Sequence, residues 1–220
     1  MRALAVGLML ALATEASAWD GFKMFEEPTT GPTSGGGGIW GTGARRDNGL
    51  TCANCHVVNG PSKVYAQIEF FPLLNQVGPN SLYRPGQRYQ LKVTLKGESL
   101  GRGFGVCGQL LTHTNGFAAA FETVKGVRVG RLESDSGQDS SACPLTVADA
   151  QPGSTVTYGS CTVISSTRRE DQTQWTFWWT APAKGAGTVM MFWGVVDGNC
   201  DLKSTGDDTK MGSVLMAEGL

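Results

Sequence analysis

The chain has 220 residues, and its 18 Lys and Arg against 19 Asp and Glu give a net charge of −1 at pH 7. This balance argues against the basic surface by which proteins hold nucleic acid or anionic membranes. The 31 glycines and the lack of long polar runs favour strands and turns over helices.

The first 18 residues have the pattern of a secretory signal peptide. Arg2 precedes an apolar run from Ala3 to Ala13, and Ala16-Ser17-Ala18 supplies the small-residue cleavage site. The run is shorter than the roughly 20 residues that a membrane span needs. We expect cleavage after Ala18 and an exported chain (periplasmic, cell-surface or extracellular) without an integral membrane segment. The alternative is a disordered or membrane-anchoring N-terminus.

Residues 19–62 are expected to form a glycine-rich lead without regular structure. Gly35 to Gly38 follow one another, and each ordered glycine costs extra backbone entropy. Such a segment is either a plain linker or a loop that lies close to a flat partner. In the second case Trp40 could stack on a flat cofactor, and Arg45-Arg46 could pair with its acidic groups.

Cys52-Ala53-Asn54-Cys55-His56 is the motif with the most specific chemistry. Two thiols at this spacing can each form a thioether with a vinyl group of one haem, and the adjacent histidine can bind its iron. This is the attachment signature of c-type cytochromes, and attachment takes place outside the cytoplasm, in agreement with export. The motif predicts one haem c on Cys52 and Cys55, with His56 as the proximal iron ligand.

Three other interpretations of these cysteines stay open. A redox dithiol normally begins a helix in a thioredoxin-like setting, which this sequence does not supply. A structural zinc site needs two further ligands. A local disulfide between Cys52 and Cys55 is the simplest alternative.

After the motif the hydrophobic pattern takes the period of two that is typical of strands. Val64 to Phe70 alternates, and Tyr83-Arg84-Pro85-Gly86 indicates a turn. From Arg88 to Lys96 every second residue is apolar, which predicts a strand with one buried face and one wet face. Asn115-Gly116 is a strong hairpin signal, expected to join strands in residues 104–129.

The second half continues the strand pattern after a polar stretch. Residues 130–153 are expected to form a long loop, and Val156 to Ile164 one strand. Trp175, Phe177 and Trp179 share one face of a later strand, with Trp178 on the other. Val189 to Val196 is apolar on both faces, as in a central strand. About seven strands predict an all-β, immunoglobulin-like antiparallel sandwich over residues 63–220.

Several of these segments occur in the order found in reeler domains. They are Tyr83-Arg84-Pro85-Gly86, Gly103-Phe104, Trp175 to Pro182, and Gly187 to Phe192. The chain from about residue 50 to 210 resembles this family, and more closely the bacterial surface proteins in which a CxxCH segment precedes a reeler-like sandwich. The resemblance implies a sandwich outside the cell. It implies no reaction, because a fold does not set a function.

The sequence does not fix the sixth ligand of such an iron. His113 is one candidate, and Met24 in the lead is its competitor. Met190, Met191 and Met211 are further candidates, although strand packing explains the first two. An open position is a further alternative. A methionine opposite the proximal histidine would raise the reduction potential, whereas a second histidine generally leaves it lower.

The remaining four cysteines are an even number in an exported chain, where disulfides persist. Of the possible pairings we favour Cys143–Cys161 and Cys107–Cys200. The first would close one polar loop, and the second would pin a mid-domain strand to a loop near the C-terminus.

Other clusters have simpler explanations. Asp207-Asp208, with Asp197 and Asp201, lacks the spacing of a calcium loop and is expected to form a solvated turn. Among the tryptophans, Trp175, Trp178, Trp179 and Trp193 are expected mostly in the core, with a sugar-stacking platform as the alternative.

No signature of a common enzyme class is present, so we expect no catalytic residues. The first functional hypothesis is a monohaem electron-transfer protein that meets a redox partner protein or a surface assembly. The second is an extracellular adhesion or binding module in which CxxCH is structural or vestigial. A third is haem-based sensing or peroxidase chemistry at an open iron.

Overall fold

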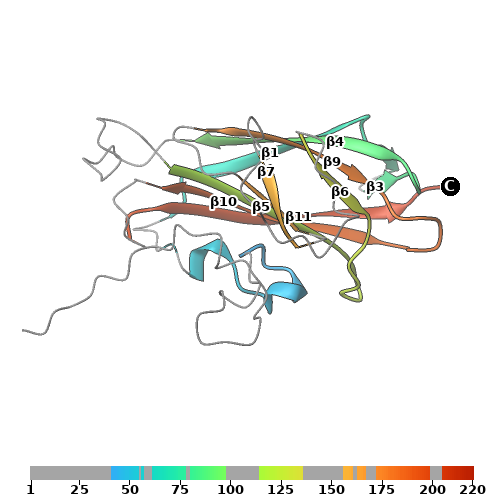
Figure 1. Cartoon of the computed structure of the whole chain (residues 1–220), viewed down its shortest axis with the longest axis horizontal. Helices are drawn as coiled ribbons and strands as arrows, with labels where there is room; N and C mark the ends of the chain where they lie inside the picture. The colour runs from blue at the N-terminus through green and yellow to red at the C-terminus, as the bar shows by residue number, and fades with distance from the viewer. Residues whose placement is uncertain are drawn as a thin grey trace, which may run out of the picture.

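The computed structural model describes residues 41–54, 56, 61–77, 80–97, 114–135, 156–160, 163–166, 172–198 and 205–220. Within these ranges the chain forms eleven strands in two sheets that pack face to face (Figure 1). The predicted all-β sandwich is confirmed. Across the described part of the chain, no helix is long and apolar enough to cross a membrane.

The smaller sheet has four antiparallel strands. Their order is β1 (Val64–Phe71), β4 (Arg88–Gly97), β9 (Gln174–Thr180) and β6 (Arg131–Ser134). The alternation predicted for β4 is confirmed, because Tyr89, Leu91, Val93 and Leu95 are all buried. The polar residues between them point away from the core, as the period of two requires.

The larger sheet has seven strands. Their order is β2 (Asn75–Val77), β3 (Asn80–Tyr83), β11 (Asp208–Glu218), β10 (Val189–Gly198), β5 (Thr114–Thr123), β8 (Val163–Ser166) and β7 (Val156–Ser160). The pairing of β11 with β3 is parallel, and the other pairs are antiparallel. β10 and β5 lie in the middle of the sheet, which agrees with their apolar residues on both faces.

Aromatic rings from both sheets fill the space between them. Phe121 of β5 stacks on Trp179 of β9 with their ring centroids 4.8 Å apart, and Phe117 stacks on Trp175 at 5.7 Å. Trp175, Phe177 and Trp179 are fully buried. The predicted division of the β9 aromatics is therefore confirmed, and stacked pairs of this kind add to the stability gained from burial.

Some predicted boundaries are wrong. Asn115 and Gly116 make no hairpin turn but lie within β5, paired with Asp197 and Val196 of β10. Residues 131–134, expected in a loop, form β6. The single strand expected at 156–164 is the antiparallel pair β7 and β8. In the first two cases pairing with a strand distant in the sequence outweighs the local turn or loop signal, and in the third the two halves of the expected strand pair with each other.

A third layer lies on the outer face of the larger sheet. It contains two short 3-10 helices, η2 (Arg45–Asp47) and η3 (Cys52–Asn54), below the lower sheet in Figure 1. Thr42 and Thr51 form an isolated antiparallel bridge, and the Gly43 N–H donates to the Leu50 carbonyl at 2.8 Å. We call residues 41–56 the attachment segment.

The attachment segment is joined to the sheet by hydrogen bonds and close packing. The Arg45 N–H donates to Oε1 of Glu122 on β5 at 2.9 Å. Inside the segment, the Asp47 carboxylate accepts hydrogen bonds from the Thr42 N–H and hydroxyl, and both residues are buried. Ala118 and Ala120, on the outer face of β5, are 6% and 1% exposed. The part of this face formed by β5 is therefore covered.

Candidate cofactor-attachment site

The CxxCH motif begins with one capped helical turn. The Asn54 side chain accepts hydrogen bonds from the N–H of Thr51 at 2.7 Å and from its hydroxyl at 3.0 Å. Both hydrogen bonds run from Thr51 to the Asn54 side chain, which corresponds to one half of a capping box and satisfies a backbone donor at the start of the turn. The His56 N–H then donates to the Cys52 carbonyl at 2.9 Å. Residues four apart on such a turn lie on the same side, so the side chains of Cys52 and His56 can contact the same cofactor.

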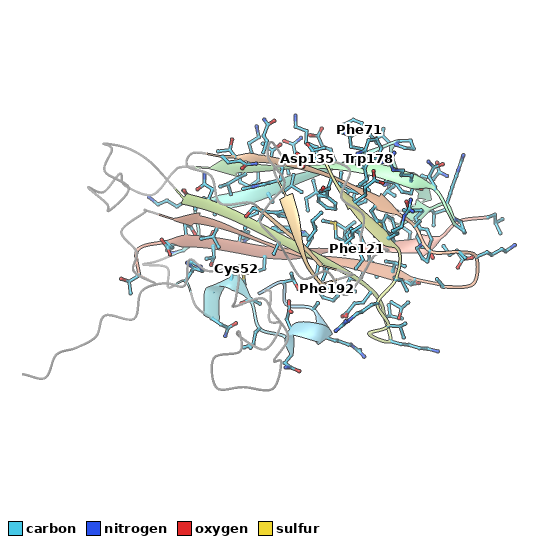
Figure 2. The ribbon with its side chains drawn as sticks, in the orientation of Figure 1. Cys52, Phe71, Phe121, Asp135, Trp178 and Phe192 are labelled. Atoms are coloured by element: carbon cyan, nitrogen blue, oxygen red, sulfur yellow. The ribbon has the colours of Figure 1, made fainter. Side chains whose placement is uncertain are left out.

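Cys52 lies directly against the larger sheet. Its Sγ, here the thiol sulfur that stands for the thioether sulfur of a haem-bearing chain, is 3.4 Å from the Gly41 carbonyl oxygen. A Cβ built on Gly194 of β10 would be 2.6 Å from that sulfur, so only a glycine leaves room for it. Figure 2 shows Cys52 on the underside of the lower sheet. Close packing thus determines where the first attachment sulfur lies.

His56 makes the most informative contact of the site. Its Nδ1 lies 2.6 Å from Oδ2 of Asp207, the residue just before β11. The Asp207 side chain is 5% exposed and that of His56 is 33% exposed. A carboxylate can only accept hydrogen bonds, so this contact requires the proton on Nδ1. In a neutral ring the lone pair is then on Nε2, the nitrogen that can bind a metal.

Such a contact is the usual surrounding of a metal-binding histidine. Ligating histidines nearly always donate the second ring N–H to a carboxylate, a backbone carbonyl or water, which fixes the tautomer and the ring orientation. The His56 side chain is 33% exposed and Cys52 is partly exposed, so a group outside the sheet can reach both. The described residues therefore fit the proximal side of a haem c site.

Several predicted site residues lie outside the described part of the chain. They are Cys55, His113, Met24, Gly35 to Gly38, Trp40 and the four cysteines Cys107, Cys143, Cys161 and Cys200. Their roles as second thioether, sixth ligand, cofactor cover and disulfide partners stay predictions. The side chain of Arg46 is likewise outside the description, and Arg45 is exposed beside the larger sheet.

The three described methionines among the ligand candidates lie on two faces of the larger sheet. Met191 is fully buried in the core of the sandwich, so it is excluded as an iron ligand. Met190 and Met211 are partly buried on the outer face of the larger sheet. Met211 pairs directly with Gly194, the residue beneath the Cys52 sulfur. Met211 thus stays a candidate on a strand next to the attachment segment.

The prediction of a solvated acidic turn is wrong for the residues that are described. Asp197, Asp207 and Asp208 are 2%, 4% and 0% exposed. Asp207 binds His56, whereas the Asp208 carboxylate accepts hydrogen bonds from the N–H groups of Lys63 and Val64 at 2.6 and 3.2 Å. Asp201 lies outside the described residues. Among the described residues no group of three or more His, Cys, Asp or Glu side chains could hold a metal ion.

Comparisons with known proteins give structural neighbours but no family. No protein-family model matches the chain, and no curated protein matches it. The human F-spondin reeler domain is similar in structure, with 11% identity and a TM-score of 0.39 over 75% of this chain and 87% of that one. A second structure, the Reelin-N domain of F-spondin, gives 13% identity and a TM-score of 0.39 over 76% and 86% of the two chains.

A bacterial structure is also among the neighbours. A conjugative transposon lipoprotein from Bacteroides eggerthii is 14% identical with a TM-score of 0.29, over 68% of this chain and 95% of that one.

Proposed function

We propose that this chain is an exported c-type cytochrome that carries one haem beside the outer face of its larger sheet. It transfers single electrons to a redox partner protein or a surface assembly in the cell envelope or outside the cell. The observation that supports the proposal is the contact between His56 Nδ1 and Asp207. It leaves the lone pair of the neutral His56 ring on Nε2, next to Cys52 on one helical turn, where it would bind the haem iron.

The described residues of the site have separate roles in this function. Haem c, when bound, supplies the one-electron couple. Cys52, together with Cys55, would hold the haem covalently. The covalent bonds would prevent its loss from the protein outside the cell. Gly194 sets the depth of the Cys52 sulfur above β10. The 33% exposure of the His56 side chain places the site near the surface, which suits transfer to a protein partner.

One preparation tests the proposal. The full chain, with residues 1–18, is expressed in a bacterial host with and without a haem-attachment system. We expect a red protein whose intact mass equals the polypeptide after signal cleavage plus one haem, and whose absorption bands survive denaturation. The Cys52→Ser, Cys55→Ser double variant should be colourless. Wild-type material from the haem-attaching host that contains only bare polypeptide contradicts the proposal.

The same protein reports on the axial ligands. His56→Ala should keep the haem mass, because the thioethers remain, but lose the native ferrous and ferric spectra. The wild-type spectrum distinguishes His–Met from bis-His ligation. If Met211 is the sixth ligand, Met211→Ala changes this spectrum and Met190→Ala does not. A five-coordinate spectrum would instead favour sensing or peroxidase chemistry at an open iron.

A binding module is the second candidate. It is favoured by the way in which the attachment segment is packed: residues 41–54 cover β5 and β10 through contacts that need no cofactor, such as that of Arg45 with Glu122. The double cysteine variant discriminates the two functions. A variant that is exported and as stable as the wild type, where the wild type also lacks haem, would favour the binding module.

A further inference from the structure

We propose that Asp207 is the positioning residue of the proximal ligand and that its charge lowers the reduction potential of the haem iron. This inference rests on the proposed function, because it needs the iron on His56. It goes further because it attributes a lowering of the reduction potential to one carboxylate, which is 151 positions away from the histidine in the sequence.

The position of Asp207 is fixed by its neighbour in the sequence. Asp208 begins β11 with its side chain on the inner face, where it binds the N–H groups of Lys63 and Val64 at the start of β1. Asp208 also pairs with Asp197 of β10. Both sheets therefore hold the backbone at this point. Because successive side chains of an extended chain point to opposite faces, Asp207 is directed to the outer face and to His56.

Burial makes the carboxylate effective. The Asp207 side chain is 5% exposed, so solvent screens its charge less than it screens a surface carboxylate. A buried negative charge hydrogen-bonded to Nδ1 increases the electron donation of the ring through Nε2. Ferric iron carries one more positive charge than ferrous iron, so the negative charge stabilises the ferric state more than the ferrous state. The expected consequence is a lower reduction potential than a backbone carbonyl at the same place would give.

A merely structural role predicts something different. If Asp207 only anchors the attachment segment, its replacement lowers stability or haem yield but leaves the potential of the surviving holoprotein unchanged. The reduction potential therefore separates the two roles, because it reports on the iron and not on the amount of folded protein.

The experiment compares isosteric variants of adjacent residues. Asp207→Asn keeps the shape and removes the charge that contacts His56. Asp208→Asn removes a charge one position away, on the opposite face and without contact to the histidine. Both are purified as haem-loaded full-length chains, and their potentials are measured by optical titration with redox mediators. We expect Asp207→Asn to favour the ferrous state by at least about tenfold, which is about 59 mV for a one-electron couple. Asp208→Asn should shift it much less, and Asp207→Glu should restore part of the wild-type value.

The outcomes distinguish this inference from the proposed function. Bare wild-type polypeptide defeats the proposed function and the inference together. Haem-loaded Asp207→Asn with the wild-type potential, or with a shift no larger than that of Asp208→Asn, overturns the inference and leaves the cytochrome intact.

A measurement on the wild type decides the matter if Asp207→Asn does not mature. The iron–histidine stretching frequency is recorded by resonance Raman spectroscopy just after photolysis of the carbon monoxide adduct. We expect a higher frequency than in c-type cytochromes whose proximal Nδ1 donates to a backbone carbonyl, because the carboxylate strengthens the bond. A frequency equal to theirs would refute the assignment.

Discussion

The two outer faces of the sandwich differ in a way that indicates their roles. On the four-stranded sheet, the Arg88 guanidinium pairs with Glu133 at 2.7 Å and lies 3.8 Å from the ring centroid of Trp178. These long side chains contact one another and water. On the seven-stranded sheet, the outer residues of β5 and β10 include Ala118, Ala120 and Gly194, all buried. Figure 2 shows Trp178 on the upper sheet and Phe192 below the lower one.

Short side chains are what a covered face requires. A backbone segment can approach a sheet closely only where the residues beneath it are small, and here Cys52 lies on a glycine. The face with long polar residues needs no cover, because its side chains are solvated. The comparison thus teaches that the attachment segment is part of the packed structure on one side only, which is the side of the proposed cofactor site.

The largest expected effect comes from a charge placed on the covered face, compared with the same charge placed on the exposed face. Ala120→Asp puts a carboxylate on the covered face, where Ala120 is 1% exposed and pairs with Phe192. An uncompensated buried charge should lower the free energy of unfolding by about 3 kcal/mol or more. The matched control is Gln67→Asp on the exposed outer face of β1, with an expected loss below about 1 kcal/mol. Urea denaturation measures both. Equal losses would mean that the attachment segment does not cover the sheet.

A smaller effect tests the close approach itself. Gly194→Ala introduces a Cβ 2.6 Å from the Cys52 Sγ and 3.2 Å from the Gly41 carbonyl oxygen. Such overpacking costs typically about 1–3 kcal/mol, and displacement of Cys52 should also reduce haem attachment.

Gly116→Ala is the control for this substitution on the same face of the same sheet. Its Cβ would find the nearest atoms, in Ser166 and Val196, at 3.8 and 3.9 Å, which is ordinary contact. We expect a neutral or slightly stabilising change there. A Gly194→Ala protein as stable and as fully loaded as Gly116→Ala would show that the sulfur does not depend on this glycine.

The fold was predictable where burial alone sets the pattern. The alternation of β4 and the aromatic face of β9 follow from a two-residue period against one core, and both are confirmed. The Asn115-Gly116 prediction failed because the turn signal is local, while the observed pairing with Asp197 and Val196 depends on a strand about 80 positions away.

Only the CxxCH part of the candidate site was predictable from the sequence. Cys52 and His56 stand in a contiguous motif, so their chemistry can be read from spacing. Asp207 cannot be identified in this way, because its role depends on β11 lying beside η3 in the folded chain. One signal was present: Asp207 directly precedes Asp208, the first residue of β11, and consecutive residues of an extended chain face opposite sides. That pattern favours one inward and one outward carboxylate over a solvated turn.

A third position belongs to neither face and should have the smallest effect. Glu218, at the end of β11, accepts hydrogen bonds from the N–H groups of Gly185 and Gly187 at 2.9 and 2.8 Å, in the turn between β9 and β10. The Tyr83 hydroxyl donates to the Gly187 carbonyl at 2.7 Å. We call this contact the turn clasp, since it ties the connection between the two sheets.

The turn clasp makes stability depend on pH in a predictable direction. The Gly185 and Gly187 N–H groups hold the pKa of Glu218 below its ordinary value of 4.5. A lowered pKa contributes stability that is present above about pH 4.5 and is lost as the pH falls through the folded-state value. Burial and the charge of Glu218 raise the pKa of Tyr83 from 10.0 to about 12. Its contribution is present below pH 10 and is lost as the pH rises from there through about 12.

Glu218→Gln should therefore flatten the decline of stability on the acid side while leaving haem attachment and the spectrum unchanged. It should also make the alkaline decline smaller, because this decline starts at the ordinary pKa of 10.0 and ends at the folded-state pKa of Tyr83, which falls when the charge of Glu218 is removed. Tyr83→Phe, by contrast, should remove the alkaline contribution and keep most of the acid one. Urea midpoints between pH 3 and 11 measure both effects. An acid decline in Glu218→Gln as steep as in the wild type would show that the responsible carboxylate is not at the turn.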